Sequence, residues 1–347
     1  MCDGMDARRH RDARRTRPAE RPRHPSDVIR SDGGFSLIEL LAVVSVMAIV
    51  AAMAVPMATS AFTGYQLRNT GKGLSGVTQL NRTVTNRSDM FAAVRNASAL
   101  LQQEGGQAGR ITVPAPVTLT GAVGLGNNTV GVSDAAWMFN GEWLDIDTGD
   151  NREVVQVTAD PGADTITGTF TGAHAANVPV RVLGGFANGV VPSTVANGSD
   201  ADELKVFGDI NGNGQMVYVE YTCDVANRRL IRNSMDFRAN AKPAPTVEQV
   251  LVDNLVANPN GTPCFTYQQK AVSGNTYVVG VAITLTVESR DVDPITGQRQ
   301  RESKALLNVS PRNVFNVWQN ASLLMNNRIQ PTPPTVTALL APIAVEE

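Results

Sequence analysis

The feature that most constrains this chain is an apolar run near its N-terminus. Phe35–Val55 is almost wholly apolar, and no charged side chain occurs from Leu40 to Leu67. At a helical rise of about 1.5 Å per residue, roughly 20 such residues span the hydrocarbon core of a bilayer. The preceding residues 1–34 contain nine Arg and no Lys, and such basic segments stay on the cytoplasmic side. We therefore expect a membrane-spanning helix over residues 35–57, preceded by a basic leader.

The start of this run does not fit an ordinary secretory signal, whose cleavage site follows its apolar region. Here a pair of small residues, Gly33 and Gly34, stands at the polar boundary in front of the run. Glu39 then places one carboxylate inside the span, where a charge costs at least about 2–3 kcal/mol and needs a specific partner. The distinctive residues therefore lie before the apolar run and at its beginning, not behind it.

The stretch from Gly33 to Leu41 resembles the class III signal of type IV prepilins and of secretion-system pseudopilins. The resemblance implies that a prepilin peptidase cuts the chain after Gly34 and methylates the new N-terminus at Phe35. Gly33 and Gly34 lack side chains that would hinder the backbone from extending into that enzyme. The resemblance also implies that the chain is a structural filament subunit and not itself an enzyme.

The same resemblance implies that two residues of the span, Glu39 and Pro56, act in filament assembly. The new α-amine of Phe35 attracts the Glu39 carboxylate of a neighbouring subunit strongly at low dielectric, which sets the axial register of the filament. Pro56 lacks an N–H and interrupts the helical hydrogen bonds, so the helix can stretch there during packing. A plain membrane anchor with an accidental Glu is the alternative interpretation.

Beyond the span, the pattern predicts that one helix continues to residue 104. Apolar side chains recur at spacings of three, four and seven residues, and we expect this stripe to pack on a β-sheet: Leu67, Leu74, Val77, Leu80, Val84, Phe91, Val94 and Leu101. Gly105 and Gly106 are expected to end the helix. The fold class is therefore α+β and, by the resemblance, pilin-like: a long N-terminal transmembrane helix over 35–104, packed on an antiparallel sheet.

Residues 111–184 show a different pattern, in which short runs rich in Val, Thr and Ile alternate with Gly, Asn and Asp turns. This pattern predicts short strands at 143–149, 153–158, 164–170 and 178–182. We interpret residues 111–184 as a β-rich module inserted between the helix and the main sheet, lying on the filament exterior and able to contact a surface ligand. An elaborated loop of the pilin fold is the alternative.

The C-terminal part predicts the main sheet over residues 200–318, with strands that include 277–288 and 301–309. The order of features there resembles the large minor pilins of the W type and the J-type minor pseudopilins. Pro331–Pro334 begins a Pro-rich stretch, and residues 319–347 are expected to form a mostly disordered tail.

Cys223 and Cys264 are the cysteines that remain once the leader, with Cys2, is removed. Two Cys in an exported domain suggest a disulfide. Because it closes a loop of about 40 residues, such a bond is worth about 3–4 kcal/mol. Two buried free thiols are the alternative.

One turn has the spacing of a calcium-binding loop. Asp209, Asn211 and Asn213 offer oxygen ligands at alternate positions, and Glu220 stands at the twelfth position. The flanking residues are strand-like and not helical, which favours a polar hairpin turn with Asn and Gly at positive φ. Calcium is the alternative for a chain in which we otherwise expect no cofactor.

The sequence offers little other chemistry. His174 is the only histidine after the leader, so a two-histidine metal site is excluded, and we expect a surface or packing role for this residue. Trp137 and Trp143 fit a small β-core better than an exposed adhesive patch. No phosphate-binding loop, dinucleotide fingerprint or zinc spacing occurs. The net charge of −2 does not favour nucleic acid as a direct partner.

These features predict a minor pilin of a type IV pilus that helps to prime or assemble the filament, since a bulky headgroup is awkward to repeat in a major subunit. The alternatives are a J-type minor pseudopilin of a type II secretion system and a pilus-associated adhesin acting through residues 111–184. The expected partners are prepilin peptidase, other pilins or pseudopilins and the inner membrane. The chain is expected to cross the bacterial inner membrane once, with its C-terminal region in the periplasm, before it enters a pilus or pseudopilus.

Overall fold

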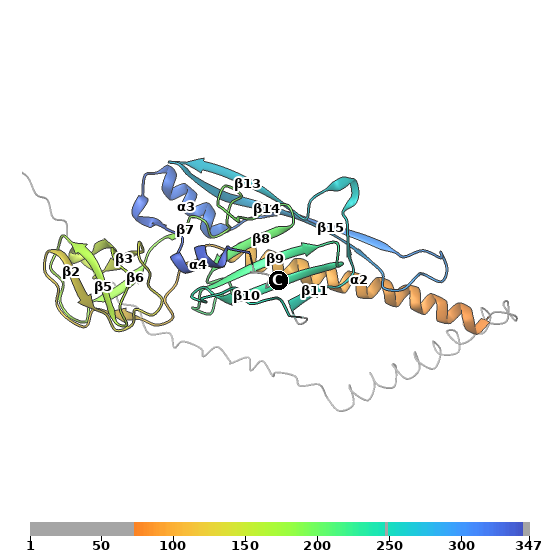
Figure 1. Ribbon diagram of the computed structural model, residues 1–347, viewed down its shortest axis with the longest axis horizontal. Helices are drawn as coiled ribbons and strands as arrows, with labels where there is room; N and C mark the ends of the chain where they lie inside the picture. The colour runs from red at the N-terminus through yellow and green to blue at the C-terminus, as the bar shows by residue number, and fades with distance from the viewer. Residues whose placement is uncertain (1–72, 247–248, 343–347) are drawn as a thin grey trace, which may run out of the picture. The chain divides into compact units, whose positions relative to one another are not determined.

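A long helix, α2 (Gly73–Gln107), opens the described part of the chain and is drawn in orange in Figure 1. The computed structural model describes residues 73–246 and 249–342, nearly all of them in one compact unit, Leu74–Glu347. Helix-favouring Ala, Leu, Gln and Arg recur along α2. Its buried apolar residues follow spacings of four, three and four: Met90, Val94, Ala97 and Leu101. That spacing places them on one face of the helix, which packs into the main core.

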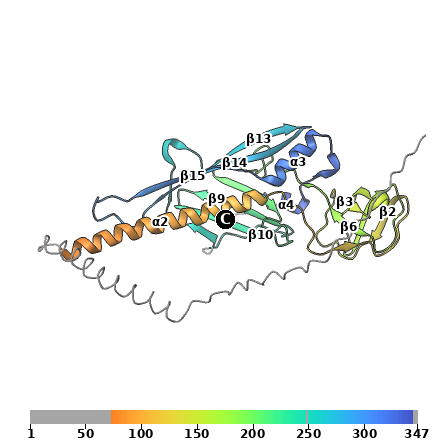
Figure 2. The same ribbon diagram turned by 180° about the vertical axis from the view of Figure 1, so that it is seen from behind.

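The first half of α2 exposes its apolar residues instead. Val77, Leu80, Val84 and Phe91 are between 38% and 57% exposed. Figure 2 shows the first turns of the helix extending past the strands of the sheets. The prediction that the apolar stripe packs on a sheet is therefore wrong for these four residues, while Leu67 and the side chain of Leu74 lie outside the described part. Periodicity identifies one face of a helix, but it does not report how far along that face the sheet reaches.

The helix also continues beyond its predicted end at residue 104. Gly105 lies inside α2, and a Cβ added there would lie 2.8 Å from Cγ1 of Val309. This glycine lets the helix approach the neighbouring strand closely, so it has a packing role and does not end the helix. The chain turns at Gly109, whose φ of +83° is a conformation that glycine adopts without steric cost.

Two antiparallel sheets form the body on which α2 packs. One has the strand order β11-β10-β9-β8; in the other the order is β12-β14-β13, and β15 also pairs with β14. The strands are β8 (Glu203–Gly208), β9 (Val217–Asp224), β10 (Arg229–Asp236), β11 (Val250–Val252), β12 (Leu255–Val256), β13 (Phe265–Val272), β14 (Asn275–Glu288) and β15 (Arg301–Val309). Both sheets and α2 share one apolar core that includes Val219, Leu230 and Leu285. The predicted α+β class with antiparallel sheets is confirmed.

The β-rich module contains shorter strands and an apolar core of its own. β1, β6, β3 and β4 form one sheet, and β2 pairs with β5. The bounds are β1 (Val117–Thr118), β2 (Gly126–Gly131), β3 (Trp143–Ile146), β4 (Glu153–Gln156), β5 (Thr165–Phe170) and β6 (Pro179–Val182). β3 to β6 lie where the sequence predicts strands. Leu119, Leu144, Ile166 and Phe170 are buried in the module core, which follows α2 and precedes β8 along the chain (Figure 1).

Short elements complete the described chain. 3₁₀ helices lie at Gly149–Asn151 (η1), Pro259–Gly261 (η3) and Asn326–Arg328 (η4), and α-helices at Arg312–Ser322 (α3) and Pro334–Leu339 (α4). β16 (Ile329–Gln330) pairs in parallel with β7 (Gly185–Phe186). Two segments more than 140 residues apart in the chain therefore meet as neighbouring strands.

The C-terminal residues differ from the mostly disordered tail predicted over 319–347. α3 continues to Ser322, β16 follows, and α4 buries Val336 and Leu339 beside the aromatic side chain of Phe186. Prolines in this stretch restrict the unfolded chain and lower the entropy cost of holding it in place, while the apolar side chains supply the burial. The prediction of disorder is therefore wrong for residues 319–342. Residues 343–347 lie outside the described part.

Gln330 ties this C-terminal strand to the β-rich module. Its side chain is fully buried, and its Oε1 accepts a hydrogen bond from the backbone N–H of Trp143 at 2.9 Å. Its Nε2 donates to the carbonyl oxygens of Trp143 and Leu183 at 2.8 and 2.7 Å. One side-chain amide thus satisfies three backbone groups of the module.

Substituting Gln330 by Ala is expected to lower the free energy of unfolding by about 2–3 kcal/mol, because three backbone groups lose a partner in a poorly solvated place. Denaturant unfolding of the full chain in detergent would measure the loss. Gln319→Ala, on the exposed side of α3, is the matched control and should change stability by less than about 0.5 kcal/mol. Equal losses of stability in the two variants would contradict the proposed stabilising role of the Gln330 hydrogen bonds.

Candidate functional site

The residues predicted for processing and assembly lie outside the described part of the chain. These are Gly33, Gly34, Phe35, Glu39 and Pro56. The predicted span over residues 35–57 lies there too. Within residues 73–246 and 249–342, no helix is both long and apolar enough to cross a bilayer. The geometry of the described part therefore concerns how α2 is held on the sheets and what the headgroup presents.

A buried ion pair fastens α2 to the sheet of β8–β11. Glu104, in the last turns of α2, is 2% exposed, and Arg232 on β10 reaches it with two nitrogens: Nη2 lies 2.7 Å from Oε1 and Nε 3.0 Å from Oε2. The Tyr221 hydroxyl on β9 donates a short hydrogen bond to the same carboxylate. Burial, together with the negative charge of Glu104, raises the pKa of Tyr221 far above its usual value. Sequence reasoning missed this cluster, because Glu104 lies more than 100 positions from both Tyr221 and Arg232.

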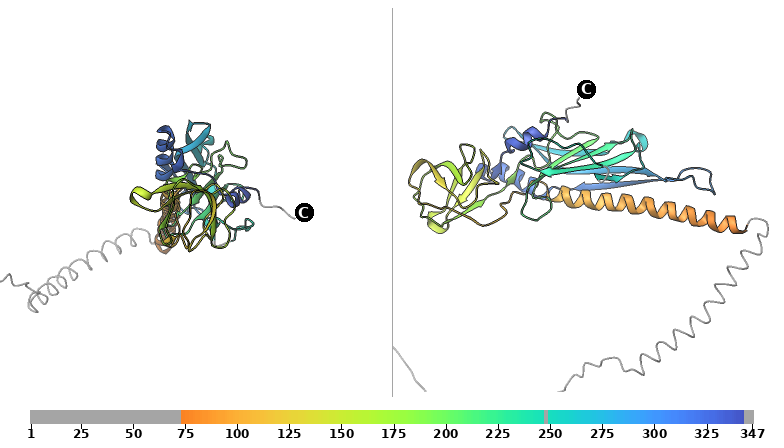
Figure 3. Two further views of the ribbon diagram at one scale, coloured as in Figure 1. Left: turned by 90° about the vertical axis from the view of Figure 1, so that its left-hand side faces the viewer. Right: turned by 60° about the horizontal axis from the view of Figure 1, so that its bottom comes forward.

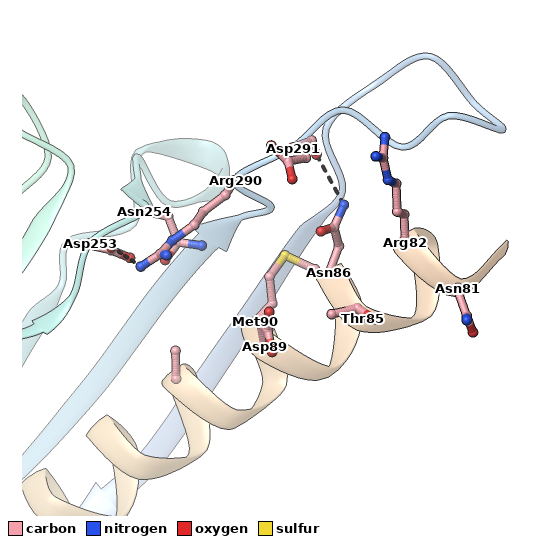
Figure 4. Close-up of a pocket in the computed structure, with 11 residues that line it drawn as sticks. Asn81, Arg82, Thr85, Asn86, Asp89, Met90, Asp253, Asn254, Arg290 and Asp291 are labelled. Atoms are coloured by element: carbon pink, nitrogen blue, oxygen red, sulfur yellow. Dashed lines mark hydrogen bonds and ion pairs between the residues drawn. The ribbon is translucent and has the colours of Figure 1, made fainter. Parts of the chain in front are cut away.

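A polar groove lies between the first half of α2 and the turns that face it (Figure 4). It is a cavity of about 530 Å³ whose helix side includes Arg82, Asn86 and Asp89. Asn86 Nδ2 donates to the carbonyl oxygen of Asp291 at 3.5 Å, and Thr83 Oγ1 donates to Asp293 Oδ1 at 2.8 Å. The β14–β15 hairpin lies along the helix (Figure 3), and these two hydrogen bonds join it to α2.

The opposite side of the groove is formed by Asp253, Asn254, Arg290 and Asp291. Arg290 forms an ion pair with Asp253. The lining side chains thus carry both signs of charge, and they include no histidine, cysteine or serine that could form a nucleophile–base pair. The groove has the chemistry of a polar contact surface.

In the turn with calcium-loop spacing, Asp209 and Asn213 direct oxygen atoms to the protein itself. Asp209 is fully buried; its Oδ1 accepts from the backbone N–H of Asn213 at 3.1 Å, and its Oδ2 lies 3.4 Å from Nε of Arg110. Asn213 Oδ1 accepts from the backbone N–H of Gln215. Asn211 is exposed. The Arg110 guanidinium therefore already forms an ion pair with the one charged ligand candidate of the turn.

The remaining ligand of that spacing is also occupied. Glu220 Oε2 accepts from the Tyr218 hydroxyl at 2.8 Å and lies 2.7 Å from Nζ of Lys242. In the described part, no group of three or more His, Cys, Asp or Glu side chains is arranged to hold a metal ion. These donors fit a structural turn better than a calcium site. Calcium binding at Asp209, Asn211 and Asn213 stays a prediction that a calcium titration of the full chain would test.

His174 lies in the interior of the β-rich module, between two acids. It is 3% exposed, with Nδ1 at 3.3 Å from Asp147 Oδ2 and Nε2 at 3.0 Å from Glu153 Oε2. Glu153 also accepts hydrogen bonds from Thr171 and from the backbone N–H of Gly172. Burial raises the pKa of Glu153, but the hydrogen bonds from His174, Thr171 and Gly172 outweigh it and lower the pKa overall. Of the two roles expected for His174, the structure shows packing, within a network that the sequence did not indicate.

Cys223 and Cys264 are joined by a disulfide, with their Cα atoms 6.5 Å apart. The bond links β9 to the start of β13, and therefore links the two sheets. Replacing both cysteines by Ser is expected to cost about 3–4 kcal/mol of unfolding free energy, because the unfolded chain loses a cross-link that closes a loop of 41 residues. Denaturant unfolding with and without reductant would measure this cost. If reductant also lowers the unfolding free energy of the double-Ser protein, the loss of stability does not come from this disulfide.

Residues 29–55 match the family model described as the prokaryotic N-terminal methylation motif. This match covers Gly33, Gly34, Phe35 and Glu39 in one stretch. The chain carries the N-terminal signal of type IV prepilins and pseudopilins. No curated protein and no solved structure matches the chain. The similarity to known proteins therefore lies in the class III signal. The role of the headgroup is inferred from the contacts of its own residues.

The class III signal carries direct consequences. It implies cleavage and N-methylation by prepilin peptidase, a membrane-anchored subunit, and assembly with other pilins or pseudopilins. It is the signal of structural subunits, not of enzymes. The charged contacts around Glu104 and the groove of Figure 4 are compatible with such a subunit, since they hold a helix on sheets and present a polar surface.

Proposed function

We propose that the chain is a minor pilin of a type IV pilus, present in few copies and acting in filament assembly or priming. The observation that carries the proposal is the class III signal on a large headgroup. That headgroup combines two sheets with a β-rich module that has a core of its own. A subunit with this additional bulk is awkward to repeat along the whole filament, which favours a place at low copy number.

Processing is the first test. The intact mass of the protein from cells with prepilin peptidase is expected to lack residues 1–34 and to carry one methyl group on Phe35, whereas cells without the enzyme should keep the leader. Gly34→Leu should block cleavage, because a large side chain hinders the extended backbone from entering the enzyme. Gly64→Ala, which lies outside the signal, is the matched control and should be cut normally. A chain cut behind the apolar run would overturn the proposal.

The choice of filament needs a second test. Deletion of the gene should reduce surface pili, and the protein should appear in sheared pili at a small fraction of the major subunit. Loss of protein secretion with normal piliation would instead favour the J-type minor pseudopilin. A surface ligand of the β-rich module stays a prediction, and its test is retention of pili with loss of adhesion when the module is altered.

A further inference from the structure

The turn that follows α3 exposes three consecutive large apolar residues. Leu323, Leu324 and Met325 are 67%, 76% and 44% exposed. α3 itself buries Val314, Val317 and Ala321 against the sheet, so its apolar face is already used. The turn therefore projects apolar side chains into solvent at the end of a helix that is otherwise well packed. Exposed apolar side chains gathered in one place mark interaction sites.

Backbone hydrogen bonds hold this turn in one conformation. The N–H of Met325 donates to the carbonyl oxygen of Asn320 at 2.9 Å, and the N–H of Leu324 donates to that of Ala321 at 3.1 Å. This pair of bonds is the Schellman motif, which ends helices with a residue in the left-handed region, usually Gly or Asn. Here the residue is Leu324, with φ of +59°. A side chain with a Cβ is strained in this conformation.

A leucine at position 324 is unfavourable for both the stability and the solubility of the protein. Glycine or asparagine would relieve the backbone strain and remove an exposed apolar side chain. Elsewhere in the described part, the non-glycine residues with positive φ are all polar: Asp147, Asn177, Asn197, Arg228, Asn260 and Ser273. A strained residue that the local fold does not require points to a role in contact with something outside the protein.

The charge around the turn indicates what that contact is. Between Glu302 and Glu346 the chain has no acidic residue, whereas Arg312 at the start of α3 and Arg328 after the turn are basic. Arg328 is exposed three residues after the turn, and Trp318 lies partly exposed on α3 before it. The chain after the leader is acidic, with 21 basic and 26 acidic side chains. The turn is thus an apolar projection followed closely by an exposed cation, Arg328, in a chain segment without acidic residues.

We propose that the Leu323–Met325 turn inserts into a lipid bilayer that carries anionic headgroups. A convex turn with consecutive apolar side chains needs no complementary pocket in lipid, and neighbouring cations favour an anionic surface. α3, which carries the turn at its C-terminal end, begins beside the end of α2, since Asn313 Nδ2 donates to the carbonyl oxygen of Gln107 at 3.0 Å.

The test uses the full mature chain held through its span in nanodiscs of phosphatidylcholine. The nanodiscs are floated with vesicles of phosphatidylcholine, alone or mixed with phosphatidylglycerol. The wild type is expected to float with the phosphatidylglycerol vesicles and to bind the phosphatidylcholine vesicles several-fold less. Leu323→Ser with Leu324→Asn and Met325→Ser should lower binding at least about tenfold, because the inserted apolar surface is lost. Leu125→Ser is the matched control, since Leu125 is 69% exposed in the β-rich module.

A separate measurement guards against misfolding of the variant. Leu324→Asn alone should raise the melting temperature by a few degrees, because Asn tolerates the left-handed conformation, while it lowers vesicle binding. A more stable protein that binds vesicles less supports insertion by the turn. The proposal is overturned if the wild type floats with neither kind of vesicle, if it binds both compositions equally, or if Leu125→Ser lowers binding as much as the triple variant does.

Discussion

Glu142→Gln is expected to make the protein about 4 kcal/mol more stable than the wild type at pH 8, and to leave its stability unchanged near pH 4. Glu142 is fully buried in the β-rich module, where its Oε1 has no hydrogen-bond partner in the described part. Burial raises its pKa from 4.5 to about 8, although a hydrogen bond from the backbone N–H of Phe139 opposes the change. The folded chain therefore keeps a proton that the unfolded chain releases.

The sign of this effect follows from linkage. From pH 4.5 to 8 the unfolded state binds fewer protons at Glu142 than the folded state does, so wild-type stability falls by about 1.4 kcal/mol for each pH unit. Glutamine does not titrate and removes this loss. Denaturant unfolding at a series of pH values, followed by the fluorescence of the module residues Trp137 and Trp143, would give the difference between the two proteins. A difference that does not change with pH would contradict the interpretation.

Glu153→Gln provides a control of opposite sign in the same module. The pKa of Glu153 is lowered in the folded state, because hydrogen bonds from His174, Thr171 and Gly172 outweigh the effect of burial. Its contribution to stability is therefore present at neutral pH and is lost as the pH falls through its folded pKa. The Gln variant should be less stable than the wild type at pH 7, and the deficit should shrink in acid. Parallel pH curves for Glu142→Gln and Glu153→Gln would show that neither effect comes from titration.

Removing either partner of the Glu104–Arg232 pair is expected to cost about 3–5 kcal/mol. Glu104→Ala leaves the Arg232 guanidinium without its partner, and Arg232→Ala leaves a carboxylate that is 3% exposed without a cation. The double Ala variant should cost little more than either single one, because it leaves neither charge unpaired. Equilibrium unfolding of the four proteins measures this coupling. Additive losses would show that the two residues stabilise the fold independently.

An exposed ion pair serves as the control for this cycle. Arg290 and Asp253 form a pair whose side chains are 74% and 48% exposed. Water and salt screen such a pair, so Arg290→Ala should cost no more than about 1 kcal/mol. A loss as large as that of Arg232→Ala would indicate that the groove of Figure 4 contributes to stability in some way other than this ion pair.

Local patterns were sufficient for several features of the chain. The strands β3 to β6 lie where alternating Val, Thr and Ile runs predict them, because strand preference is carried by consecutive residues. Periodicity also predicted a helix leading up to residue 104. It was wrong about which apolar residues are buried, and it missed Met90 and Ala97, since burial depends on where the sheets end. The prolines of the tail led to a prediction of disorder. The tail is ordered because apolar residues that follow these prolines, Val336 and Leu339, are buried in the core.

The sequence by itself was sufficient to identify the class III signal. That signal is a short continuous stretch, and its recognition depends on consecutive residues and not on tertiary contacts. The sequence also limited disulfide pairing to Cys223 and Cys264, since the leader holds the third cysteine. Only the tertiary structure decided that Gln330 binds the backbone of Trp143, 187 positions away, and that Arg232 meets Glu104 across 128 positions. Those contacts arise from which segments pack together. Gln, Glu and Arg side chains usually lie in solvent, and they are buried here because the fold supplies each with a partner.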